Sequence, residues 1–146
     1  MEIRPSCCLA RLPSGRSFAG SGSATFADGV GTSASFNLPD RVAISGGILY
    51  VADRGNHRIR SIVIATGNVT TLAGTGVAGY VDDADNARFN QPLDVSLSAD
   101  GAALYVCDHR NHRIREVRSL ERALRAARLS VPAPRVPLFS LLGSPC

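Results

Sequence analysis

Several features that mark other classes of protein are missing from the sequence. No segment approaches the run of about 18 apolar residues that crosses a membrane, and the first residues contain no apolar stretch long enough for a signal peptide. The four cysteines, Cys7, Cys8, Cys107 and Cys146, contain no C-x-x-C pair and have no regular spacing. They suggest neither a zinc site nor a disulfide framework. If the chain is complete, these absences predict a cytoplasmic protein that contacts no membrane.

Lysine and tryptophan are absent, and aromatic residues make up only 5% of the chain. Half of the 16 arginines lie between residues 110 and 135, where the net charge is +6, whereas the remainder of the chain stands at −2. The body of the protein therefore offers no basic surface for phosphate, and few rings are present on which bases could stack. RNA binding remains only a minor alternative.

Glycine and proline are plentiful, with 14 and 8 residues. Hydrophobic residues account for 45% of the chain and charged residues for 19%, which is typical of soluble globular proteins. Many turns between short elements favour β structure over long helices.

Two long segments of the chain match when the sequence is shifted by about 54 positions. Residues 19–22 match 73–76, residues 36–39 match 89–92, and residues 49–53 match 104–108. The strongest match is Asn-His-Arg-Ile-Arg, which is identical at residues 56–60 and 111–115. The chain is therefore built from an internal repeat.

Within the first copy, turn residues separate four short segments that we expect to be strands, at residues 42–45, 48–52, 57–64 and 68–73. Gly46 and Gly47 supply the positive φ angles of a tight hairpin, and residues 53–56 form a second hairpin loop. Four antiparallel strands in one repeat of this length predict a blade of a β-propeller. A glycine-rich, acidic loop at residues 74–88 joins the copies.

The block Tyr-Val-Ala-Asp-x-x-Asn-His-Arg-Ile-Arg at residues 50–60, echoed at 105–115, resembles the NHL repeat. WD40 and kelch repeats share the architecture, but the chain has neither a Gly-His to Trp-Asp signature nor any tryptophan. The resemblance covers residues 16–117. Residues 1–15, which precede this region, are a non-repeat segment. It implies an all-β fold with two four-stranded antiparallel blades, at about 36–73 and 89–117, from an incomplete propeller of the six-bladed type.

A propeller closes with about four to eight blades, so two blades do not form a ring. We expect either that the chain is a fragment of a longer propeller or that several copies close a ring in trans. Residues 16–19 align with 70–73 and are expected to be a stray outer strand of a preceding blade.

The repeat pattern is lost after Val117, and residues 118–146 form a separate tail. Its composition predicts a basic amphipathic helix over residues 117–129, followed by a proline-rich end. We expect a solvated tail; the alternative is a contact for an acidic partner, RNA or an anionic surface.

The polar residues of the repeated block stand at the same positions in both copies, which favours a structural role over catalysis. We expect the two aspartates to accept backbone N–H bonds and the two asparagines to adopt a left-handed conformation. The residues predicted to build the repeated turn are Asp53, Asn56, His57, Arg58 and Ile59 and, in the second copy, Asp108, Asn111, His112, Arg113 and Ile114.

No catalytic, cofactor-binding or metal-binding residue is predicted, and we expect no enzyme. Asp82, Asp83, Asp85 and Asn86 could offer oxygen ligands to calcium, but their spacing is not that of an EF-hand, and a solvated loop is preferred. The match between Asp28 and Asp82 suggests that this aspartate helps to shape the loop. No nucleophile elbow and no phosphate-binding fingerprint is present.

The resemblance implies an interaction scaffold that binds a protein or another ligand through propeller loops. Strand alternation sends the two arginines of each block to one face, opposite the isoleucine. The possible partner surface is therefore Arg58, Arg60, Arg113 and Arg115. The alternatives that the resemblance implies are an RNA-binding module and a metal-dependent lyase or hydrolase.

Overall fold

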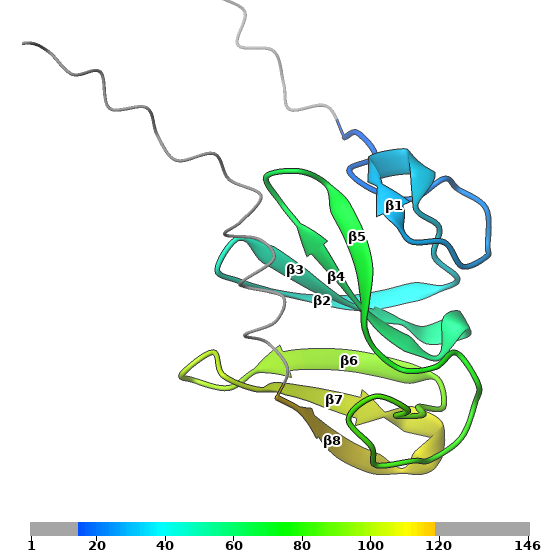
Figure 1. Cartoon of the computed structure of the whole chain (residues 1–146), viewed down its shortest axis with the longest axis vertical. Helices are drawn as coiled ribbons and strands as arrows, with labels where there is room; N and C mark the ends of the chain where they lie inside the picture. Colours follow the sequence, from blue (N-terminus) through cyan, green and yellow to red (C-terminus); the bar gives the residue numbers. More distant parts are fainter. Residues whose placement is uncertain (1–14, 119–146) are drawn as a thin grey trace, which may run out of the picture.

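Two antiparallel sheets pack against each other in the computed structural model, which describes residues 15–118 (Figure 1). The first sheet has the order β1-β5-β4-β3-β2 and the second has the order β6-β7-β8. The strands are β1 (Gly29–Val30), β2 (Pro39–Ser45), β3 (Ile48–Asp53), β4 (Arg58–Val63), β5 (Asn68–Ala73), β6 (Pro92–Leu97), β7 (Leu104–Asp108) and β8 (Arg113–Val117). Three single-turn 3-10 helices, η1 (Gly31–Ser33), η2 (Arg54–Asn56) and η3 (His109–Asn111), complete the described elements.

Local sequence explains the hairpins. Gly46 and Gly47, with φ of 55° and 80°, form the two-residue turn between β2 and β3, which demands positive φ at both positions. Strand β3 lies between β2 and β4 in the first sheet and is an unbroken apolar run from Ile48 to Ala52. Such a run suits a strand that is covered on both faces.

Each face of the first sheet has its own core. The face toward the second sheet packs Tyr50 and Ile59 into a cluster that also contains Phe89, Val95 and Val106. On the opposite face, a smaller cluster lies beneath the segment that precedes β2; it consists of Ala34, Val51, Ile62 and Val69. Strand β6 lies against β2 and β3, so the first strands of the two repeats are neighbours.

The predicted strands of the first copy correspond to β2, β3, β4 and β5. The second copy has three strands among the described residues, and the place of its fourth strand falls beyond residue 118. Residues 16–19 are not a strand, so the prediction of a stray outer strand there is wrong. Its partner would be a strand of a preceding blade, and residues 15–118 contain none. The helix predicted over residues 117–129 does not begin at Val117, which is the last residue of β8. Residues 119–146, with the rest of that helix and the proline-rich tail, lie outside the described residues.

Candidate functional site

The repeated turn follows β3 in one sheet and β7 in the other and has the same backbone in both copies. After η2, His57 adopts the left-handed conformation with φ of 54° and ψ of 37°, and His112 after η3 has 53° and 42°. The prediction that Asn56 and Asn111 take this conformation is wrong. Each asparagine is the last residue of its 3-10 turn, and the histidine that follows reverses the chain into the next strand.

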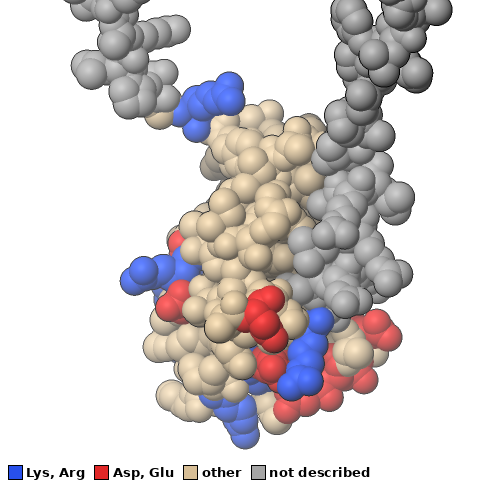
Figure 2. Space-filling view, turned by 90° about the vertical axis from the view of Figure 1, so that its left-hand side faces the viewer, with Lys and Arg blue, Asp and Glu red and all other residues tan. Residues whose placement is uncertain are grey.

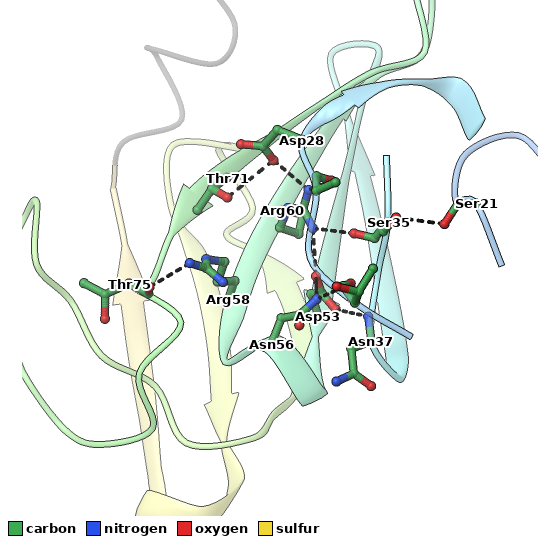
Figure 3. A network of polar contacts seen from close by, with 12 residues as sticks. Ser21, Asp28, Ser35, Asn37, Asp53, Asn56, Arg58, Arg60, Thr71 and Thr75 are labelled. Carbon is green, nitrogen blue, oxygen red and sulfur yellow. Dashed lines mark hydrogen bonds and ion pairs between the residues drawn. The ribbon is translucent and has the colours of Figure 1, made fainter. Parts of the chain in front are cut away.

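Asp53 is the centre of a buried network in the first copy (Figure 3). One carboxylate oxygen accepts the backbone N–H of Asn37 at 2.8 Å. The other accepts the Asn56 side-chain amide at 2.9 Å and Nη1 of Arg60 at 2.8 Å. The carboxylate thus ties the turn to the segment that precedes β2.

Arg60 extends this network to the loop before β2. Its fully buried guanidinium donates from Nη1 to the carbonyl of Ser35 at 3.1 Å and from Nη2 to the carbonyl of Ala27 at 2.8 Å. Nη2 also pairs with Asp28 at 2.6 Å, and the ring of Phe26 lies 4.9 Å from the guanidinium carbon. We call Asp53, Asn56 and Arg60 the clamp, because they fix one loop to one blade.

The second copy builds the same clamp from Asp108, Asn111 and Arg115. Asp108 accepts the backbone N–H of Asn90 at 2.7 Å, the Asn111 amide at 2.7 Å and Nη1 of Arg115 at 3.0 Å. The guanidinium of Arg115 also reaches three groups of the loop before β6, namely the carbonyl of Arg88 at 2.9 Å, the carbonyl of Val81 at 2.8 Å and the carboxylate of Asp82 at 2.6 Å. The two repeats therefore form clamps with the same hydrogen-bonding pattern.

The burial of Arg60 and Arg115 corrects the predicted partner surface. Alternation does place both arginines of a block on one face, since Arg58 and Arg60 both lie over Phe26. However, Arg60 is fully buried and Arg115 is 8% exposed, because each neutralises a buried aspartate. The face drawn in Figure 2 shows arginine and acidic side chains side by side rather than a continuous basic surface.

The remaining residues of the first block reach forward to the second repeat. Nδ1 of His57 accepts the backbone N–H of Gln91 at 3.1 Å, and Nη2 of Arg58 donates to the carbonyl of Thr75 at 2.7 Å. Ile59 lies in the core between the sheets. Burial and the neighbouring Arg60 lower the pKa of Arg58. We call His57, Arg58 and Ile59 the connector, because they join one blade to the next.

The connector of the second copy is exposed. His112 and Arg113 lie at the surface, and Arg113 donates to the carbonyl of Asn111 at 3.1 Å and stacks 4.0 Å from the centre of the Tyr80 ring. Ile114 is exposed as well. The same five-residue sequence therefore occupies two different environments in one chain.

The acidic loop at 74–88 is organised by its own hydrogen bonds. The Tyr80 hydroxyl donates to Asp82, and this bond raises the pKa of Tyr80; the same bond, assisted by Arg115, lowers the pKa of Asp82. Asp83 accepts the backbone N–H groups of Asn86 and Asp85, which lower its pKa. Residues 15–118 contain no group of three or more histidine, cysteine, aspartate or glutamate side chains placed to hold a metal ion.

Sequence comparison within the chain could have found more of this site. Phe26 and Tyr80 are related by the same shift as Asp28 and Asp82, so an aromatic residue two positions before the aspartate marks the loop that receives the clamp. The backbone donors Asn37 and Asn90 carry no such signal, because any residue can supply a peptide N–H.

The NHL repeat model matches residues 36–60 and 89–116, which contain both clamps and both connectors. The chain carries two NHL repeats. The chain is 39% identical over 92 residues to human NHL repeat-containing protein 2, and the match covers 60% of this chain but only 13% of that relative. The two sheets are blades of an NHL-type β-propeller.

Solved structures agree with this assignment. An auxiliary nutrient binding protein from Bacteroides thetaiotaomicron is 31% identical with a TM-score of 0.60, and the match covers 68% of this chain and 27% of that chain. A candidate phosphatase from the same organism is 27% identical with a TM-score of 0.61, covering 69% of this chain and 26% of that chain. The chain thus spans about a quarter of each propeller structure. No helix among residues 15–118 is long and apolar enough to cross a membrane.

Proposed function

We propose that the two NHL repeats form an interaction module that binds a protein partner through the loops at one rim of the blades. The turns η2 and η3 lie at this rim beside the segments before β2 and β6. The N–H of Gly55 donates to the carbonyl of Asn37 at 2.8 Å, and the N–H of Arg110 donates to the carbonyl of Asn90 at 3.0 Å. Backbone bonds and clamps together hold the rim in one conformation, which lowers the entropy cost of binding.

The observation that carries the proposal is the contrast between constant and variable positions in the repeated turn. The clamp residues are identical in the two copies, whereas the two positions between the aspartate and the asparagine differ, with Arg54 and Gly55 in one copy and His109 and Arg110 in the other. The residues of the clamp are therefore constant within the chain, whereas the two positions that they enclose in the turn vary. This is the arrangement expected of a rigid framework that presents binding residues on loops.

Gln91 links the two turns into one surface. Its side-chain oxygen accepts Nη2 of Arg54 at 3.4 Å and Nε of Arg110 at 3.3 Å. His109, which precedes Arg110 in η3, is exposed. We define the rim surface as Arg54, Gln91, His109 and Arg110; its two guanidinium groups suit a partner with an acidic or amide-rich segment.

Affinity capture from an extract of the source organism tests this proposal. The bait is the 146-residue chain, compared with a rim variant that carries Arg54→Ala, His109→Ala and Arg110→Ala. The control carries Arg16→Ala and Arg118→Ala, which remove two exposed arginines away from the turns. We expect a protein that the wild type and the control retain and the rim variant loses.

Equal retention by all three baits, or the absence of any specifically retained protein, refutes binding through the rim. Capture that disappears after ribonuclease treatment would instead assign the surface to RNA. Circular dichroism of each bait shows whether the blades remain folded.

A further inference from the structure

The two repeats pack through one interface. The residues equivalent to each half of this interface are exposed in the other repeat. On the first sheet, Tyr50 and Ile59 are 0% exposed because the second sheet covers them. The equivalent residues of the second sheet, Tyr105 and Ile114, are 43% and 71% exposed. We call this surface, which also includes Cys107, His112 and Arg113, the trailing face.

The other half of the interface is exposed at the opposite end. Val95 on β6 is 4% exposed and Leu97 is half-buried, and both pack toward the first sheet. Their equivalents on β2, Val42 and Ile44, are 61% and 63% exposed. We call this surface, together with Ser21, Gly22 and Leu38, the leading face.

The residues that make polar contacts across the internal interface also have equivalents on the trailing and leading faces. The guanidinium of Arg58 crosses Gly76, where it occupies the space that a Cβ would need, and reaches the carbonyl of Thr75. Gly22 has nearly the same φ as Gly76, 85° against 88°, but nothing lies within 4 Å of its Cβ position. The leading face thus contains a glycine shaped to receive a guanidinium, and the trailing face presents Arg113.

The histidine contact repeats the pattern. Nδ1 of His57 accepts the N–H of Gln91, a residue with φ of 52°. Leu38 is its equivalent in the first repeat, has φ of 49° and is 64% exposed. His112 on the trailing face is the corresponding acceptor.

We propose that copies of this chain associate head to tail, the trailing face of one copy packing on the leading face of the next as the two repeats pack within the chain. In that contact Arg113 donates to the carbonyl of Ser21 across Gly22, His112 accepts the N–H of Leu38, and Ile114 packs beside Val42 and Ile44. The occupant is a second copy because this chain already shows that these two surfaces fit each other. Such a heterologous contact closes a ring if its rotation permits.

Mixing of two variants tests the head-to-tail geometry. Ile114→Arg blocks only the trailing face, and Ile44→Arg blocks only the leading face; both residues are exposed, so neither change disturbs the described core. Sedimentation velocity under reducing conditions, which keep Cys107 a free thiol, reports the mass. We expect a concentration-dependent assembly for the wild type, a monomer for each variant, and a 1:1 dimer that grows no further when the variants are mixed.

A wild type that remains monomeric overturns the proposal, as does a mixture that fails to form a dimer while both variants keep the wild-type circular dichroism spectrum. If either variant misfolds, Arg113→Ala provides the second test, with Arg118→Ala as its matched control. We expect Arg113→Ala to weaken association roughly tenfold, because a charge-assisted hydrogen bond is lost, and Arg118→Ala to leave it unchanged. An equal effect of both arginine variants contradicts the assigned contact. Ile44 and Ile114 are not part of the rim surface. The outcome of the mixing experiment is therefore independent of whether the rim binds a protein.

Discussion

Replacing Asp53 by alanine removes the acceptor at the centre of the first clamp. Three hydrogen bonds are lost, from the N–H of Asn37, the amide of Asn56 and Nη1 of Arg60. Removing one partner of a buried ion pair costs about 3–5 kcal/mol, since the other charge stays in the interior. Asp28 still pairs with Arg60, so we expect a loss of ~3 kcal/mol, near the lower end of that range.

Urea unfolding followed by far-ultraviolet circular dichroism measures this loss. With a slope of about 1–3 kcal/mol per M, the midpoint should fall by about 1–3 M. The control is Asp28→Ala, which removes the other carboxylate bonded to Arg60. The Asp28 side chain is 44% exposed, so water replaces much of what is lost and we expect a change below about 1 kcal/mol.

A double-mutant cycle adds a second criterion. Replacing Arg60 by methionine in the Asp53→Ala background removes the unpaired charge, so the double variant should be more stable than the sum of the two single changes predicts. If Asp53→Ala costs no more than Asp28→Ala, or if the two changes at Asp53 and Arg60 are additive, the clamp does not hold the loop as described.

Two further predictions use pairs within the chain. Gly76→Ala and Gly22→Ala place a Cβ at nearly the same positive φ, but only at Gly76 does it meet a guanidinium, that of Arg58. We therefore expect Gly76→Ala to lower the unfolding midpoint more than Gly22→Ala at concentrations where the chain is monomeric, and equal losses would show that backbone strain alone acts. In the acidic loop, Asp82→Ala should lower the pKa of Tyr80 toward its ordinary value of 10.0, because the phenol loses its acceptor. Spectrophotometric titration with Tyr80→Phe to assign the signal checks this, and an unchanged tyrosine profile would contradict it.

The strands and hairpins could be predicted because their causes are local. Gly46 and Gly47 impose the tight turn, and the apolar run from Ile48 to Ala52 requires a strand covered on both faces. The conformation of the repeated turn was assigned to the wrong residue, Asn56, because asparagine tolerates the left-handed region better than histidine. In the fold, the side chain of Asn56 is held by Asp53, and His57 takes the left-handed position instead.

Strand alternation correctly placed Arg58 and Arg60 on one face but could not tell which of them reaches water. The position of Arg60 beside the buried Asp53 depends on where η2 turns the chain, so its burial is a tertiary property. The loop aspartates Asp28 and Asp82 were partly predictable, since they match under the repeat shift. Their arginine partners lie 32 and 33 residues away in sequence, and no local pattern connects them.

The sequence by itself determined the repeat, the blade and the turn, because these depend on residues that are neighbours along the chain. The tertiary structure decided how the motif is divided between a clamp within each blade and a connector to the next. The sequence Asn-His-Arg-Ile-Arg is identical in both copies, yet Ile59 is fully buried and Ile114 is mostly exposed. Burial is a property of a residue and its neighbour in space, and the second blade lies against the first on only one side.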